Sequence, residues 1–128
     1  MSYYKAKIVD LSFDEAIQKA TDELKKVGFG ILTEIDVKET LKKKIDVDFR
    51  NYKILGACNP KFAHQALTAE DKIGVLLPCN VIVQETEEGK VEVAIMNPAE
   101  AMSVVKNDDL EPIAAEVNKL LETALENI

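Results

Sequence analysis

The stretch YKILGACNP (Tyr52–Pro60) decides the fold, because it joins a strand directly to a helix. Residues 52–57 have the apolar, strand-like pattern of a buried strand. Asn59 is a preferred N-cap, and Pro60 suits the first helical position, where its missing N–H is not needed. We expect the helix that follows to carry His64 and to end near Ala69. A strand that runs straight into a helix is typical of a domain whose helices pack on a sheet.

Toward the N-terminus, the sequence predicts two strand–helix units. Residues 3–10 form the first strand candidate, and Ser12-Phe13-Asp14-Glu15 has the spacing of a capping box. The apolar positions that follow recur at helical spacing as far as Gly28, a natural helix stop. Residues 29–35 form the second strand candidate. Asp36 is a cap for a helix that extends to about Lys44.

Toward the C-terminus, the pattern predicts a hairpin and then helices. Residues 73–86 are strand-like, with Pro78-Cys79-Asn80 marking an edge or a bulge. Residues 87–90 form a turn, and residues 91–96 alternate as a half-buried strand. Asn97 and Pro98 start a short helix in the same way as Asn59 and Pro60. From Asp109 to Ile128 an apolar stripe at helical spacing predicts a last helix, which we expect to pack on the protein's own sheet rather than on a partner.

These elements predict one domain over residues 1–128, because no linker or repeat divides the chain. The fold class is α+β. We expect a two-layer α/β sandwich in the order βαβαβαββαα, with a mixed, mostly antiparallel sheet of about five strands and helices packed on it. The size is that of a common single domain, which needs neither a disulfide nor a metal to fold.

The composition disfavours nucleic-acid and lipid partners, a membrane span and secretion. The net charge is −7, from 23 acidic and 16 basic residues, and it disfavours nucleic acid and anionic lipid. No apolar run is long enough to span a membrane. The first residues, Met1 to Lys5, lack the apolar region of a secretory signal. Since two cysteines are too few for a disulfide framework, we expect a cytoplasmic protein in reducing surroundings.

Distinctive chemistry gathers at Cys58, His64 and Cys79. The sequence has no phosphate-binding glycine loop, nucleophile elbow, paired-cysteine zinc motif or EF-hand loop. Cys58 stands just before a helix start, where the backbone favours a negative charge and a thiol becomes more reactive. His64 lies about one turn into that helix. Cys79 stands at the break in the neighbouring strand candidate. The sequence therefore predicts a site around Cys58, and it leaves the distances among the three side chains open.

Three chemistries fit these residue types. The two thiols with His64, and with Glu34 as a possible further ligand, could hold zinc or another thiophilic metal. Cys58 and Cys79 could form a reversible disulfide if their Cα atoms lie within about 7 Å. Cys58 could act as a catalytic nucleophile with His64 as its base. For a small-molecule ligand, the candidate contacts are Cys58, Asn59, Cys79, Asn80 and Glu34.

Each residue also has a purely structural interpretation. Cys79 can be a small core hydrophobe, and Cys58 has about equal claims to a packing role and a functional one. His64 can be an exposed or hydrogen-bonded side chain, and Glu34 an ordinary surface carboxylate. Asn59 is chiefly a cap.

Several longer motifs resemble one known family. They are GFGILTEIDVK (residues 28–38), YKILGACNP with the following Ala63-His64 and Ala66-Leu67, LLPCNV (residues 76–81) and Met96-Asn97-Pro98. Together they span nearly the whole chain and resemble the domain of unknown function 302 family of bacteria and archaea. The resemblance implies a small two-layer α/β fold. It implies no established activity, cofactor or catalytic residue.

Three hypotheses about function follow. The leading one is a module that binds a small ligand or thiophilic metal, or acts in thiol redox, around Cys58, His64 and Cys79. The second is a homodimer or adaptor without catalytic activity, which associates through a sheet edge or the C-terminal stripe. The third is an enzyme with Cys58 as nucleophile and an unknown substrate. The sequence does not decide whether the protein is an enzyme.

Overall fold

Local sequence signals place most of the helices and strands in the computed structural model, which describes residues 2–128. Met1, the first residue of the segment considered for a secretory signal, lies outside the described residues. The strands are β1 (Tyr4–Val9), β2 (Gly30–Asp36), β3 (Tyr52–Cys58), β4 (Cys79–Glu85) and β5 (Val91–Met96). The helices are α1 (Phe13–Lys26), α2 (Val37–Ile45), α3 (Pro60–Ala69), α4 (Pro98–Ala101) and α5 (Glu111–Glu126), with 3₁₀ segments η1 (Asp71–Leu76) and η2 (Ser103–Val105).

Three of the predicted helix starts have the expected caps. Ser12 and Glu15 form the capping box of α1: the Glu15 amide donates to Ser12 Oγ at 3.2 Å, and the Ser12 amide donates to Glu15 Oε1 at 3.0 Å. The Glu39 amide donates to Asp36 Oδ1 at the start of α2. Asn59 caps α3. At the start of α4, however, Asn97 caps nothing with its side chain, which donates instead to the Ser2 carbonyl.

The five strands form one sheet in the order β1-β5-β4-β3-β2, and all four neighbouring pairs are antiparallel. The predicted α+β sandwich with about five strands is confirmed. The sheet has none of the parallel pairing that a mixed sheet requires among the described strands. The reason is topological: the connections from β2 through β5 each return the chain antiparallel to the strand before, and β1, at the opposite edge from β2, pairs antiparallel with β5.

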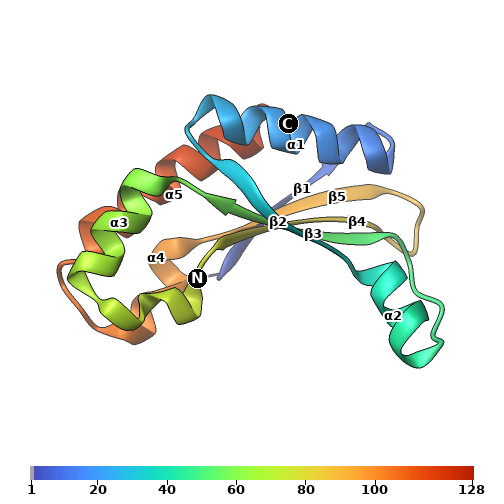
Figure 1. Ribbon diagram of the computed structural model, residues 1–128. Coiled ribbons are helices and arrows are strands. Elements are labelled where there is room, and N and C mark those ends of the chain that lie inside the picture. The colour runs from blue at the N-terminus through green and yellow to red at the C-terminus, as the bar shows by residue number, and fades with distance from the viewer. Residues whose placement is uncertain (1) are drawn as a thin grey trace.

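Helices α1 and α5 cover one face of the sheet and form the main core with it (Figure 1). Leu24 of α1 and Leu121 of α5 are each buried to about one per cent exposure or less, against Val81 and Val93 of the central strands. The apolar stripe of the C-terminal helix therefore packs on the protein's own sheet, as predicted. Among residues 2–128, none of the helices has both the length and the apolar content needed to cross a bilayer.

The predicted start of one strand is wrong. Residues 73–76 were expected to begin a strand, but they lie in the 3₁₀ segment η1, and β4 begins only at Cys79. Ile73 is 1% exposed because it packs with Ala66 of α3 and Leu110 in a second, smaller apolar cluster. This tertiary packing overrides the β-preference of Ile73 and Val75.

Candidate functional site

The junction between β3 and α3 positions the first candidate side chains. Ala57, near the end of β3, is fully buried in the main core, and Cys58 ends the strand half-buried. Asn59 then caps α3: the backbone amides of Lys61 and Phe62 donate to its Oδ1 at 3.2 and 3.5 Å. Because Asn59 Oδ1 accepts from the backbone of the first turn of α3, it fixes the position of that turn relative to the preceding Cys58.

Gly28 makes room for this cap. Its φ of +90° is the left-handed conformation that glycine tolerates, and a Cβ built on it would lie 2.8 Å from Asn59 Nδ2. A larger residue at position 28 would be strained by its backbone and would push the Asn59 side chain away. The glycine stop of α1 therefore also supports the start of α3.

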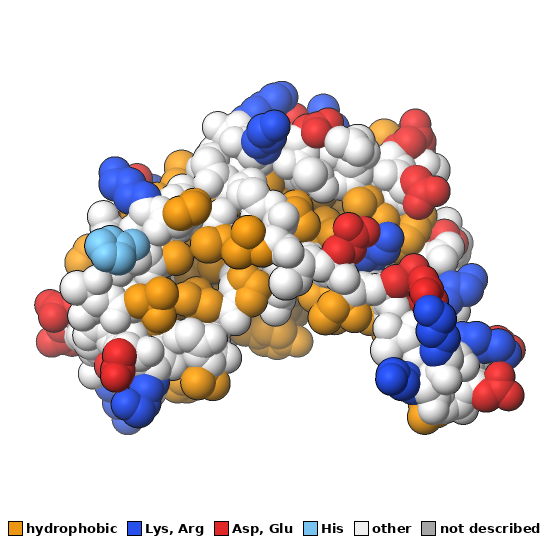
Figure 2. Space-filling model, viewed as in Figure 1, with side chains coloured by type: hydrophobic (Ala, Val, Ile, Leu, Met, Phe, Trp, Pro, Cys, Tyr) orange, Lys and Arg blue, Asp and Glu red, His pale blue; other side chains and the backbone are white. Residues whose placement is uncertain are grey.

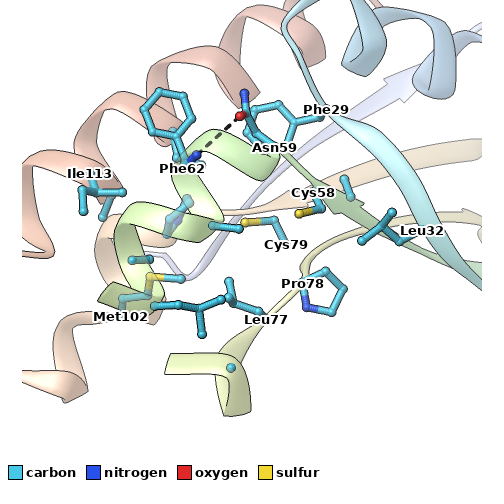
Figure 3. Close-up of a pocket in the computed structure, with 18 of the residues that line it drawn as sticks. Phe29, Leu32, Cys58, Asn59, Phe62, Leu77, Pro78, Cys79, Met102 and Ile113 are labelled. Atoms are coloured by element: carbon cyan, nitrogen blue, oxygen red, sulfur yellow. Dashed lines mark hydrogen bonds between the residues drawn. The ribbon is translucent and has the colours of Figure 1, made fainter. Parts of the chain in front are cut away.

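A cavity of about 380 Å³ opens beside this junction. The ends of β2, β3 and β4 form one wall, α3 forms a second, and α5 with the α4 segment forms a third. Figure 3 shows side chains from these separate segments pointing into one space, among them Phe62, Ile113 and Met102. The walls come from both apolar clusters of the protein, so the cavity lies where the main core meets the smaller one.

The lining is almost entirely apolar. None of its 20 residues is charged, and only Thr33 and Asn59 have a side-chain oxygen or nitrogen. The space exists because short side chains stand where the helices approach each other: Ala63 and Ala66 on α3, and Ala114 on α5. Figure 2 shows hydrophobic side chains gathered around a hollow on the α3 side of the molecule. At the rim, Leu32 and Leu67 are 68% and 43% exposed.

Both cysteines line this cavity as free thiols (Figure 3). Cys79 is 7% exposed, and Cys58 is half-buried. Burial in apolar surroundings, with a smaller electrostatic contribution from the nearby Cys58, raises the pKa of the Cys79 thiol to about 11. Cys79 therefore stays protonated at neutral pH, and Cys58 is the more accessible thiol of the two.

The other predicted site residues lie elsewhere. His64 is exposed on α3 and is not part of the cavity wall, since that helix turns Phe62, Ala63 and Ala66 toward the cavity. Glu34 is paired with Lys53 on the sheet, at 2.8 Å from its Nζ. Asn80 is exposed on β4.

The structure thus brings Cys58, Asn59 and Cys79 together and leaves the other three predicted contacts outside. Within residues 2–128, no group of three or more His, Cys, Asp or Glu side chains is arranged to hold a metal ion. Cys58, His64 and Cys79 do not form the three-ligand metal site predicted from the sequence. The reason is the helical phase of α3, which points His64 outward.

Most residues of the cavity wall have no sequence pattern that marks them as site residues. Phe62, Met102 and Ile113 come from three separate segments, and each has the pattern of an ordinary core residue. The sequence feature that indicates the cavity is the set of alanines at positions 63, 66 and 114, which are short side chains on the inward faces of two helices. Short residues also occur wherever helices pack closely, so this signal does not distinguish a cavity from a tight contact.

Comparisons with known proteins agree with this fold. A structure described as "Crystal structure of uncharacterized conserved protein DUF302 from Bacillus stearothermophilus" is 28% identical in sequence, covers 99% of this chain and 98% of its own, and superimposes with a TM-score of 0.92. No curated protein matches the chain. Residues 5–128 match the family described as "Domain of unknown function DUF302". The chain therefore belongs to the DUF302 family.

Proposed function

We propose that the protein binds a small, uncharged, apolar molecule in the cavity between the sheet end, α3 and α5. One observation carries the proposal: a solvent-open space of about 380 Å³ whose 20 lining residues include no charged side chain. Ligand sites are usually preformed hollows of roughly 300–1,000 Å³, lined by apolar groups with a few polar contacts. Here the polar contacts available are Thr33, Asn59 and the two thiols.

The volume limits the size of the ligand. A space of about 380 Å³ is equivalent to roughly a dozen water molecules at about 30 Å³ each. A ligand of about a dozen non-hydrogen atoms, at roughly 0.3–0.7 kcal/mol per atom, gains about 4–8 kcal/mol. The corresponding dissociation constants run from about 1 mM to about 1 µM. An ionised ligand is disfavoured, because the lining offers it no opposite charge.

The exposed rim supports the same chemistry. Leu32 and Leu67 keep apolar surface in contact with water at the opening, which is unfavourable unless a ligand covers it. The half-buried thiol of Cys58 is a weak hydrogen-bonding partner at the base of the first helical turn. A ligand with one weak polar group and an apolar body matches this distribution.

The test is a titration with 1-aminoanthracene, a neutral fluorophore that brightens in apolar surroundings. Ala114→Leu places a larger side chain in the cavity, whereas Ala115→Leu adds the same side chain to an exposed position on the same helix. We expect saturable brightening with the unmodified protein, affinity weakened at least about tenfold by Ala114→Leu, and no such change with Ala115→Leu. Equal affinities of the two variants, or no saturable signal, would contradict the proposal.

A second candidate is a reversible disulfide between Cys58 and Cys79, which both line the cavity as free thiols. In the register of β3 and β4, Ala57 is the direct partner of Cys79, so Cys58 is one residue out of register with Cys79. Strands about 4.8 Å apart with a rise of about 3.4 Å per residue place such Cα atoms about 6 Å apart, within disulfide reach. Because neighbouring positions of a strand point to opposite faces, the strand ends must twist for the two sulfurs to meet. Oxidised glutathione would accept the two electrons and two protons. A Cys58–Cys79 cross-linked peptide in the mass spectrum is expected, and its absence after full oxidation would exclude this candidate.

A further inference from the structure

A second hollow adjoins the ligand cavity at its α4 end. It has a volume of about 310 Å³ and lies between α4, η2 and the first turn of α5. Three residues line both spaces: Met102, Leu110 and Ala114. Figure 3 shows Met102 on the side of the cavity opposite Leu32. The two spaces therefore share one wall, and the second lies beyond the cavity from the exposed rim at Leu32.

The shared wall has one movable side chain. Ala114 contributes only a methyl group, and Leu110 is buried in the smaller apolar cluster with Ala66 and Ile73. Met102 packs against the edge of that cluster and is only half-buried. A methionine side chain has three rotatable bonds and adapts its shape to its surroundings. When the Met102 side chain turns aside, the cavity and the second hollow become one elongated site.

The two spaces differ in polarity. None of the 20 residues around the cavity is charged. Half of the residues around the second hollow are polar, and we call it the polar hollow after them: Ser103, Lys106, Asn107 and Glu111. Ligand sites combine apolar walls with a few placed polar groups that fix the orientation of the ligand. An apolar compartment beside a polar one therefore matches a ligand with an apolar body and one polar end.

Two of the four polar side chains of the polar hollow hold the protein's own backbone. Asn107 Nδ2 donates to the Ala69 carbonyl at 3.0 Å, and Asn107 Oδ1 accepts from the Asp109 amide at 3.0 Å. Ser103 Oγ donates to the Glu100 carbonyl at 2.7 Å. These bonds tie the loop before α5 to the end of α3 and close the turn after α4. The donors of Asn107 and Ser103 are therefore used within the chain.

Lys106 and Glu111 are the polar groups that can serve a ligand. Both are exposed, and among residues 2–128 neither forms an ion pair. The Lys106 ammonium only donates hydrogen bonds, and the Glu111 carboxylate only accepts them. An anionic head group would be repelled by Glu111, and a cationic one by Lys106. An uncharged head group that both accepts and donates, such as a carboxamide, can bond to the two together.

We infer that the ligand is an uncharged amphiphile, a primary carboxamide on an aliphatic chain. The chain fills the apolar cavity and passes Met102, and the head group lies in the polar hollow. There the carboxamide oxygen accepts from Lys106 Nζ, and its N–H donates to the Glu111 carboxylate. A flexible chain suits the passage, because it must bend past the side chains that separate the two spaces. This inference rests on the proposed function and adds the class and the orientation of the ligand.

Displacement of 1-aminoanthracene by octanamide tests the inference at neutral pH, with octanoate and octylammonium as matched ions. Octanamide is expected to bind at least about fivefold more tightly than either ion, the effect of about one hydrogen bond. Lys106→Met and Glu111→Met remove the two head-group partners, and Lys119→Met and Glu116→Met are controls at exposed positions of α5. Methionine is unbranched like lysine, so it adds no new strain at the φ of 55° of Lys106.

Each hollow variant should weaken octanamide binding about fivefold and leave direct binding of 1-aminoanthracene unchanged, while both controls bind octanamide as the unmodified protein does. Octanoate should gain affinity in Glu111→Met, and octylammonium in Lys106→Met, because each variant removes a repelling charge. If 1-aminoanthracene never saturates, the proposed function fails and this inference fails with it. If it saturates but octanamide binds no better than the two ions, or the hollow variants match their controls, this inference alone is overturned.

Discussion

Replacing Ala114 with leucine should stabilise the protein if the cavity is open space rather than packed core. Ala114 is 5% exposed and stands on the α5 wall of the cavity. Leucine adds three carbon atoms, and each buried CH₂ contributes about 0.8 kcal/mol, so the gain is about 2.4 kcal/mol when the cavity accepts the side chain without strain. Alanine and leucine are both good helix formers, so the helix itself changes little.

The matched comparison is Ala16→Leu. Ala16 lies on α1 in the main core, is fully buried, and is not part of the cavity wall. The same three carbons have no free space there, and overpacking of this kind destabilises a protein by about 1–3 kcal/mol. The two variants should therefore differ in free energy of unfolding by roughly 3–5 kcal/mol, with opposite signs relative to the unmodified protein.

Urea unfolding followed by circular dichroism measures both values. Equal slopes with a higher midpoint for Ala114→Leu and a lower midpoint for Ala16→Leu are the expected result, since a shift in midpoint at constant slope reports stability alone. Similar losses of stability in both variants would refute the reasoning. Such a result would mean that α3 and α5 close together around Ala114 in solution.

Three further predictions concern particular side chains. The pKa of Cys79 is raised to about 11 from its ordinary value of 9.0, so between these two pH values the folded state keeps the thiol proton and the unfolded state loses it. Stability should therefore fall as the pH rises from about 9 to about 11. Cys79→Ala should lessen that fall in urea titrations, and an unchanged pH profile would contradict the prediction. Ser12→Ala removes half of the capping box and should cost about 1 kcal/mol by urea unfolding, whereas no loss would mean that the cap is dispensable. His64→Ala should change the affinities for 1-aminoanthracene and for zinc by no more than about twofold, because His64 lies outside the cavity wall. A tenfold loss of zinc affinity, equivalent to about 1.4 kcal/mol, would restore the metal hypothesis.

Local signals were sufficient to predict most of the fold. The capping box at Ser12 and the caps at Asp36 and Asn59 are formed by neighbours in sequence, so their geometry follows from a few residues. The apolar stripe of α5 has one simple way to be buried, against the sheet. Signals that act over three or four residues thus predicted the ends of these helices to within one or two positions.

The failures have a different physical origin. Ile73 adopts a 3₁₀ segment because its packing with Ala66 and with Leu110, which is distant in sequence, outweighs its local β-preference. His64 misses the cavity because the phase of α3 is set by which of its residues pack inward, and the sequence of that helix has apolar residues on more than one side. Both outcomes depend on tertiary packing, which no short window contains.

The candidate site was predicted only in part for a similar reason. Cys58, Asn59 and Cys79 were identified by their chemistry and by their places at a strand end and a helix start. The cavity that they share is formed by short side chains on two helices about fifty residues apart. An alanine on a helix does not by itself indicate a cavity. The apolar space can be recognised only in the folded structure, where both helices that line it are in place.

The proposed apolar site is tested most directly by the methyl group of Met102, which lines the cavity, whereas Met96 does not. Protein labelled with ¹³C-methyl methionine is titrated with 1-aminoanthracene and observed by NMR. The account predicts a saturable shift of the Met102 methyl resonance, with the Met96 resonance unmoved. Binding without a change at Met102, or equal shifts of both methionines, would contradict it.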